Sequence, residues 1–235
     1  MFDRPQVLRV TTLVLLVGLL CPFGLTALEM GDSLPEAALE LPLVDLEGAT
    51  SSLAAHGIES GLLLVFTSNT CPYATDWLDR FPRLAKAAQE RDLPFLLVNS
   101  NARKRQAEDS PEAMAELVEE HAFDFPYLVD PESRLADALG ATRTPEVFLF
   151  DGERRLVYHG ALDDHSGPFE KVENHWTLEA MDQAFSGGVV ETAETPPLGC
   201  AILRPRKRRP RPAKQEPVAS TESGETDSLP QREEH

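Results

Sequence analysis

The chain has 235 residues, of which 42% are hydrophobic and 26% charged, and its formal net charge at pH 7 is −17. This composition describes one ordinary globular domain with additional segments. So acidic a chain repels nucleic-acid phosphates, and three Cys and six His without a tight cluster argue against a disulfide-dense scaffold or a zinc-finger array. We therefore expect no nucleic-acid partner, no metal and no other cofactor.

Residues 1–27 have the pattern of a targeting segment. Arg4 and Arg9 precede the apolar run 10–20, which is short for a bilayer span and typical in length of a signal-peptide core. We expect export to the periplasm or cell envelope, with the leader either cleaved or kept as an anchor. The only membrane contact expected is through this segment, and Cys21 leaves with a cleaved leader.

Residues 28–203 form the predicted folded domain, in which strand and helix patterns alternate. The predicted strands are 62–67, 93–98, 126–129, 146–150 and 156–159, and the predicted helices are 77–88 with a kink at Pro82, 110–121, 130–139 and 172–185. The last two strands are joined through Asp151-Gly152, which is typical of a hairpin turn. This order predicts an α/β fold with a central mixed sheet flanked by helices.

Residues 204–235 differ from the domain in composition. A basic, proline-containing stretch up to Lys214 is followed by an acidic segment rich in Ser and Thr, which has almost nothing to bury. We expect a disordered tail that is basic in its first half and acidic in its second. Because the tail has more basic than acidic residues, the rest of the chain is more acidic than the whole.

Cys71 directly follows the first central strand and precedes the first helix. A thiol in this position faces unpaired backbone N–H groups and the positive end of the helix dipole, and both favour the thiolate. An arbitrary cysteine is more often a small buried hydrophobe, but this position is that of a reactive one. We identify Cys71 as the candidate nucleophile.

Four motifs follow one another along residues 30–203. They are FTSNTCPY at 66–73, Thr144-Pro145, YHG at 158–160 followed by two aspartates, and TPPLGC at 195–200. Their order and spacing resemble the redoxin group of the thioredoxin superfamily, and in particular its exported peroxiredoxin-like and thiol-disulfide oxidoreductase-like members. The resemblance implies a thioredoxin-like fold with an added β-α segment. It also implies a cis proline at Pro145 facing Cys71, with Thr70, Pro72 and Thr144 as substrate-binding neighbours.

Ser68 is a departure from the thioredoxin pattern, because it occupies the first position of the Cys-x-x-Cys turn. A dithiol within this turn is thereby excluded. Ser68 and Cys71 instead resemble the Thr/Ser-x-x-Cys of peroxiredoxins, in which the hydroxyl hydrogen-bonds the reacting thiolate. Peroxiredoxins also carry a Pro four residues before this hydroxyl, where the chain has Leu64. Peroxide reduction and disulfide exchange therefore both stay open.

Three further residues complete the candidate site. Arg143 lies in the loop expected to face Cys71 and is either the cation that stabilises the thiolate or orients a peroxide, or a surface Arg paired with an acidic residue. Glu146 follows the same loop and is either a proton relay or a strand-edge residue. Cys200 is the second cysteine of the mature domain, and the two either form a reversible disulfide, form a permanent structural bridge or stay unpaired.

The sequence predicts an exported thiol oxidoreductase whose single nucleophile, Cys71, attacks a peroxide oxygen or a disulfide sulfur. Cys200 or an external thiol then resolves the product. The resemblance implies a peroxide or a protein disulfide as substrate and an external thiol or thioredoxin-like protein as electron donor. The alternative is a redox-inactive thioredoxin-like binding module of the cell envelope.

Overall fold

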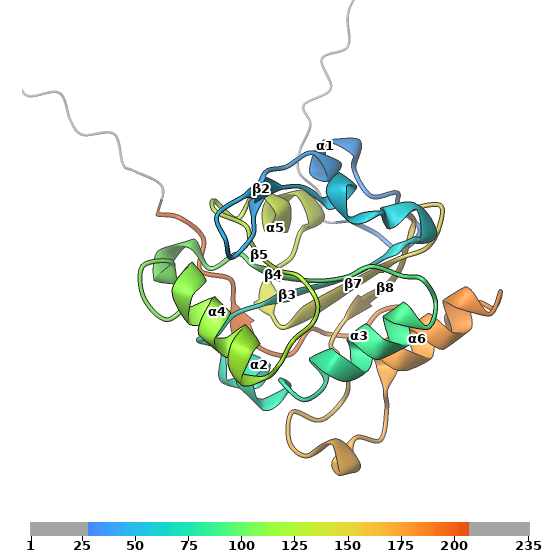
Figure 1. Ribbon diagram of the computed structural model, residues 1–235. Coiled ribbons are helices and arrows are strands. Elements are labelled where there is room, and N and C mark those ends of the chain that lie inside the picture. Colours follow the sequence, from blue (N-terminus) through green and yellow to red (C-terminus); the bar gives the residue numbers. More distant parts are fainter. Residues whose placement is uncertain (1–27, 207–235) are drawn as a thin grey trace, which may run out of the picture. The chain divides into compact units, whose positions relative to one another are not determined.

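The computed structural model describes residues 28–206 (Figure 1). Its strands are β1 (Leu43–Val44), β2 (Thr50–Ser51), β3 (Leu62–Thr67), β4 (Phe95–Asn99), β5 (Tyr127–Val129), β6 (Arg143–Thr144), β7 (Glu146–Phe150), β8 (Leu156–Gly160) and β9 (Cys200–Ala201). Its helices are α1 (Glu36–Leu39), α2 (Pro72–Asp76), α3 (Phe81–Gln89), α4 (Pro111–Glu120), α5 (Arg134–Leu139) and α6 (Trp176–Phe185). The predicted leader, and the predicted tail beyond residue 206, lie outside the described residues.

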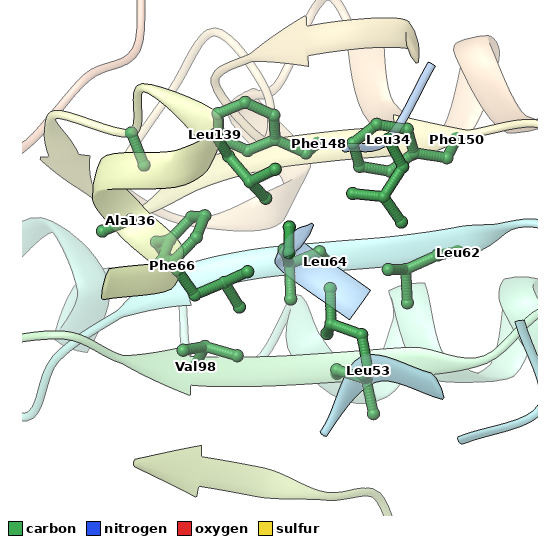
Figure 2. Packing of buried hydrophobic residues seen from close by; sticks show 14 of the residues in the cluster. Leu34, Leu53, Leu62, Leu64, Phe66, Val98, Ala136, Leu139, Phe148 and Phe150 are labelled. Atoms are coloured by element: carbon green, nitrogen blue, oxygen red, sulfur yellow. The ribbon is translucent and has the colours of Figure 1, made fainter. Parts of the chain in front are cut away.

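Seven of the strands form one mixed sheet in the order β2-β1-β5-β4-β3-β7-β8, and β6 pairs with β9 separately. All six residues of strand β3 are buried. Since successive side chains of a strand point to opposite sides, both faces of β3 are covered. Leu62, Leu64 and Phe66 pack in the cluster shown in Figure 2, on the face covered by α1 and α5. Leu63 and Val65 pack in a second cluster with α3, α4 and α6. The continuous apolar run of β3 thus fits a strand covered by helices on both sides.

The carboxyl ends of β3, β4 and β5 lie at one edge of the sheet, because these strands are parallel. Strand β7 runs antiparallel to β3 and pairs Glu146 with Phe66, so the chain enters β7 at the same edge. Cys71 follows β3 there, and Thr144-Pro145 precedes β7. The topology therefore brings together two segments that are 73 residues apart in the sequence.

The first predicted helix differs from the prediction. Instead of one helix kinked at Pro82, the chain forms the short α2, turns through Trp77–Arg80 and starts α3 at Phe81. Pro82 lies in the first turn of α3, where its missing N–H has no intrahelical partner to lose. The proline therefore starts a helix rather than bending one. The last helix begins at Trp176, four residues later than predicted.

Helix α5 also begins four residues later than predicted, at Arg134, and the remaining predicted elements are confirmed within a residue or two. Ser110 caps α4 by accepting a hydrogen bond from the N–H of Ala113, and Gly140 ends α5 in the left-handed conformation. The fold is thioredoxin-like. None of the described helices is long and apolar enough to cross a membrane.

Candidate redox site

Cys71 is the N-cap residue of α2 and is almost completely buried, with 1% of its surface exposed. Its Sγ donates a hydrogen bond to the carbonyl oxygen of Thr144 at 2.7 Å. The Thr144-Pro145 peptide bond is cis, as the resemblance implied. Because α2 has only five residues, its dipole is weaker than that of the longer helix that the sequence predicted. The carbonyl oxygen of Thr144, in the loop before β7, is thus a direct hydrogen-bond partner of the thiol.

Ser68 and Thr144 lie beside this thiol and are both buried. The Ser68 hydroxyl is 3.5 Å from the hydroxyl of Thr144, which is also 3.5 Å from the carbonyl oxygen of Cys200. Within residues 28–206, Thr144 is the only hydrogen-bond partner of the Ser68 side chain. The two hydroxyls thus form a short polar path along the same loop that contacts Cys71.

Cys200 is brought to Cys71 by the pairing of β9 with β6, in which it lies opposite Thr144. Both cysteines are free thiols, and Cys200 is half-buried. Burial, a hydrogen bond with Cys71 and the charge of Cys71 together raise the pKa of Cys200 to about 11, and Arg143 acts in the opposite direction. The two thiols are therefore direct neighbours, and Cys200 stays protonated at neutral pH.

Gly199 makes this approach possible. Its φ is +150°, and a Cβ built on it comes within 2.0 Å of the carbonyl oxygen of Thr144. No other residue fits here without moving one of the two strands. The glycine of the TPPLGC motif is thus the residue that lets the Cys200 strand lie against the loop that contacts Cys71.

Arg143 does not reach the Cys71 thiol, which corrects the position expected from the sequence. Its side chain is exposed, and its Nη1 donates to the carbonyl oxygen of Gly199 at 3.0 Å. Successive side chains of a strand point to opposite sides. Because Thr144 of β6 is buried, its neighbour Arg143 points outward. The guanidinium therefore acts on the Cys200 segment.

The three other predicted substrate-binding residues, Pro145, Pro72 and Thr70, differ in their exposure and contacts. Pro145 is buried with Thr144, and Pro72 is exposed at the start of α2. The Thr70 hydroxyl donates to Oδ2 of Asp109 at 2.9 Å, so it faces a buried carboxylate rather than open solvent. Sequence reasoning missed Asp109. Its only signal in the sequence is its position directly before the helix cap Ser110.

Comparison with known proteins agrees with this arrangement. The family model described as AhpC/TSA family matches residues 30–159, more than half of the chain. The chain belongs to the AhpC/TSA family. This confirms the redoxin group of the thioredoxin superfamily and supports a redox function in general.

Two solved structures are similar to this AhpC/TSA family chain over most of their length. A hypothetical protein from Sinorhizobium meliloti 1021 is 31% identical, with 77% of this chain and 98% of that chain covered and a TM-score of 0.68. An uncharacterized conserved protein from Geobacillus kaustophilus is 29% identical, with 78% and 94% covered and a TM-score of 0.65. Comparison with curated protein sequences gave no match.

Glu146 supports the loop before β7 of this AhpC/TSA family chain. It is 1% exposed, and its Oε2 accepts from the backbone N–H groups of Thr142 and Arg143 at 2.7 and 2.6 Å. Its Oε1 lies 2.7 Å from Nε2 of His159. Both carboxylate oxygens are thus occupied, one by the turn before Pro145 and the other by His159, which favours a structural role over a proton relay to Cys71.

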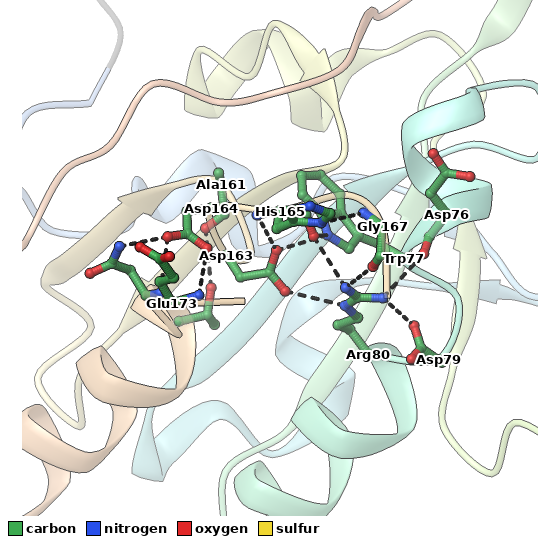
Figure 3. Close-up of polar contacts among 12 residues, drawn as sticks. Asp76, Trp77, Asp79, Arg80, Ala161, Asp163, Asp164, His165, Gly167 and Glu173 are labelled. Carbon is green, nitrogen blue, oxygen red and sulfur yellow. Dashed lines mark hydrogen bonds and ion pairs between the residues drawn. The ribbon is translucent and has the colours of Figure 1, made fainter. Parts of the chain in front are cut away.

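A second polar cluster holds the turn that follows α2 (Figure 3). Asp163 accepts from the indole N–H of Trp77 at 2.9 Å and from Nε of Arg80 at 3.2 Å, and both charged side chains are buried. Arg80 also donates to the carbonyl oxygens of His165 and Gly167. Across the described range 28–206, no three His, Cys, Asp or Glu side chains are grouped to hold a metal ion.

Proposed function

We propose that this protein is a thiol oxidoreductase in which Cys71 is the nucleophile and Cys200 resolves the oxidised sulfur. The observation that carries the proposal is that the two free thiols meet at Thr144, whose carbonyl oxygen accepts from Cys71 and which pairs with Cys200 across β6 and β9. The raised pKa of Cys200 keeps this thiol protonated at neutral pH, which disfavours it as the first attacker. The assignment therefore gives the first step to Cys71 and the second to Cys200.

With a hydroperoxide as substrate, the Cys71 thiolate attacks the terminal oxygen. An S–O bond forms, the O–O bond breaks, and the alkoxide takes up a proton and leaves as an alcohol, while Cys71 becomes a sulfenic acid. The sulfur of Cys200 then attacks that of Cys71, and the hydroxyl leaves as water with the Cys200 proton. Two thiols of an external donor reduce the disulfide and are themselves oxidised to a disulfide.

With a disulfide as substrate, the same two cysteines act in the same order. The Cys71 thiolate forms a mixed disulfide with one sulfur and displaces the other as a thiolate, which takes up a proton. Cys200 then displaces the bound sulfur, so the substrate leaves as two thiols and the protein holds a Cys71–Cys200 disulfide. Peroxide reduction and disulfide exchange thus converge on one oxidised state of the protein.

The surface next to the thiols favours a protein as electron donor. Tyr73 and Leu198 are two residues away from Cys71 and Cys200, and they are 43% and 37% exposed. Large exposed apolar side chains are uncommon in this domain, and at a protein interface they provide contact area. We propose a thioredoxin-like donor that approaches over these two residues. The leader pattern of residues 1–27 supports export, which cell fractionation of the full chain tests.

The test compares wild type, Cys71→Ser and Cys200→Ser with hydrogen peroxide and with a model disulfide. We expect Cys71→Ser to lose turnover of at least one substrate completely, and the wild-type preference to identify the chemistry. We expect Cys200→Ser to accumulate a sulfenic acid or mixed disulfide on Cys71. Full turnover of both substrates by Cys71→Ser, or no turnover by wild type, contradicts the proposal, and the second result favours a binding module.

A further inference from the structure

Asp109 is a completely buried carboxylate at the edge of the sheet where the thiols lie. Its Oδ1 accepts from the backbone N–H of Asn69 at 2.8 Å and from Nδ2 of Asn99 at 2.9 Å. Its Oδ2 accepts from the hydroxyl of Thr70 at 2.9 Å and from Nδ2 of Asn101 at 3.1 Å. Both oxygens are thus occupied, and two of the four donors belong to the residues directly before Cys71.

Asn101 extends this network to the segment that carries Cys200. While its Nδ2 donates to Asp109, its Oδ1 accepts from the backbone N–H of Leu203 at 2.8 Å. The carbonyl oxygen of Leu203 accepts from the N–H of Arg103 at 3.2 Å. Leu203 is three residues after Cys200, so a continuous path of hydrogen bonds runs from the Cys71 loop through Asp109 and Asn101 to the Cys200 strand.

The charge of Asp109 is not paired with a cation at its carboxylate. Arg105 donates instead to the backbone carbonyl oxygens of Asp109 and Asn99, at 3.0 and 2.7 Å. Burial lowers the pKa of Arg105, and the charges of Asp109, Tyr127 and Asp130 oppose this effect. A buried carboxylate is costly, and a neutral residue that filled the same space would avoid that cost. Four convergent donors, two from the loop that leads to Cys71 and two from the end of β4 and the turn after it, indicate that its geometry is needed.

We propose that Asp109, acting through Asn101, is a positioning residue that holds the Cys71 loop and the Cys200 strand in register for disulfide formation. This inference rests on the proposed Cys71–Cys200 couple. It does not place Asp109 in contact with the reacting sulfurs, since its bonds end at Asn69, Thr70 and Asn101. Its effect is therefore on the probability that the two thiols meet, which is measured as an effective concentration.

The experiment equilibrates the full chain with oxidised and reduced glutathione. One oxidised glutathione and the two protein thiols give the Cys71–Cys200 disulfide and two reduced glutathiones, so the equilibrium constant is the effective concentration of the pair. We expect Asp109→Asn to lower this constant by about tenfold, because an amide in this position faces four donors with its own NH2 group. The matched control is Asp163→Asn, a buried aspartate outside the network, for which we expect a change of less than about twofold.

A second measurement separates alignment from the reactivity of Cys71 itself. In a Cys200→Ser background, we expect Asp109→Asn to change the rate at which glutathione disulfide reacts with Cys71 by less than about threefold. If Asp109→Asn does not fold, Thr70→Val removes one of the four hydrogen bonds with little change in shape, and we expect it to lower the effective concentration by about threefold.

The outcomes are distinct. If wild type forms no Cys71–Cys200 disulfide at any glutathione ratio, the proposed couple itself is wrong. If wild type forms it and the folded Asp109 or Thr70 variants have the wild-type constant, the couple stands and the positioning role is overturned. An equal loss in Asp163→Asn also overturns it, because general loosening of the domain then explains the effect.

Discussion

Two buried aspartates anchor the chain on either side of Cys71, and they do so differently. Asp163 holds the turn after α2 and is paired with Arg80, so a cation balances its charge directly. Asp109 holds the loop before Cys71 and accepts only from neutral amide and hydroxyl donors at its carboxylate. The Asp163 cluster fastens a loop to a helix turn, whereas the Asp109 cluster joins the two segments that carry the thiols. We therefore expect the Asp163 cluster to determine the stability of the domain and the Asp109 cluster to determine the alignment of the two thiols.

The largest effect is expected from Arg80→Met. This change leaves Asp163 as a buried carboxylate without its cation, and breaking such a pair costs about 3–5 kcal/mol of the free energy of unfolding. Urea denaturation measures the loss. The control is Arg91→Met, whose partner Asp182 is 67% exposed, so that the loss is below about 1 kcal/mol. Equal losses in the two variants contradict the structural role of the Asp163 cluster.

Gly199→Ala tests whether the Cys200 strand must lie against Thr144. We expect a loss of about 1–3 kcal/mol from strain, together with a lower yield of the Cys71–Cys200 disulfide, because the new Cβ meets the Thr144 carbonyl oxygen. The control is Gly187→Ala, which also has a positive φ but has no atom within 4 Å of the added Cβ. Denaturation and non-reducing gels measure the two effects. An unchanged disulfide yield in Gly199→Ala contradicts the geometry.

Tyr127→Phe removes a donor from the edge of the Asp109 cluster. The Tyr127 hydroxyl is buried and donates to Oδ1 of Asn69 at 3.0 Å. Leaving this oxygen without a partner costs about 1 kcal/mol in the free energy of unfolding, measured by urea denaturation. We also expect a lower equilibrium constant for forming the Cys71–Cys200 disulfide with glutathione. A variant as stable as wild type, with the same equilibrium constant, shows that Asn69 is held without this bond, by its backbone N–H and its own amide group.

The smallest effect is a shift in the titration of Cys200. Burial, the hydrogen bond with Cys71 and the charge of Cys71 together raise its pKa to about 11. In Cys71→Ser we expect the midpoint for alkylation of Cys200 to fall but to stay above the ordinary value, since burial is retained. The folded state keeps this proton where the unfolded chain has lost it, so stability also declines as pH rises toward 11. An unchanged midpoint contradicts the contact between the thiols.

The sequence predicted the central strands and the position of Cys71 because these depend on local patterns. The run of five apolar residues in β3 needs helices on both faces, and a cysteine at the end of such a strand lies at the binding edge of the sheet. The cap at Ser110 and the turn at Gly140 are equally local. Elements of two residues, such as β6 and β9, carry no periodic signal and depend on tertiary contacts.

The residues that contact the two thiols could not be predicted either, because their positions depend on tertiary contacts. Arg143 and Thr144 are neighbours in the sequence, and only the pairing of β6 with β9 decides which of them faces the thiol. Asp109 is 38 residues from Cys71 along the chain and reaches its loop through a turn that has no sequence signature. Hydrogen bonds across such separations follow from the completed fold rather than from any local preference.

The most direct test of the account is peptide mapping of the Cys21→Ser protein after one equivalent of oxidant, without reduction. The account predicts one cross-linked peptide pair that contains Cys71 and Cys200 and disappears when dithiothreitol is added. Sulfenic acid that persists on Cys71 together with an unmodified Cys200 thiol contradicts it, because the two sulfurs then do not meet.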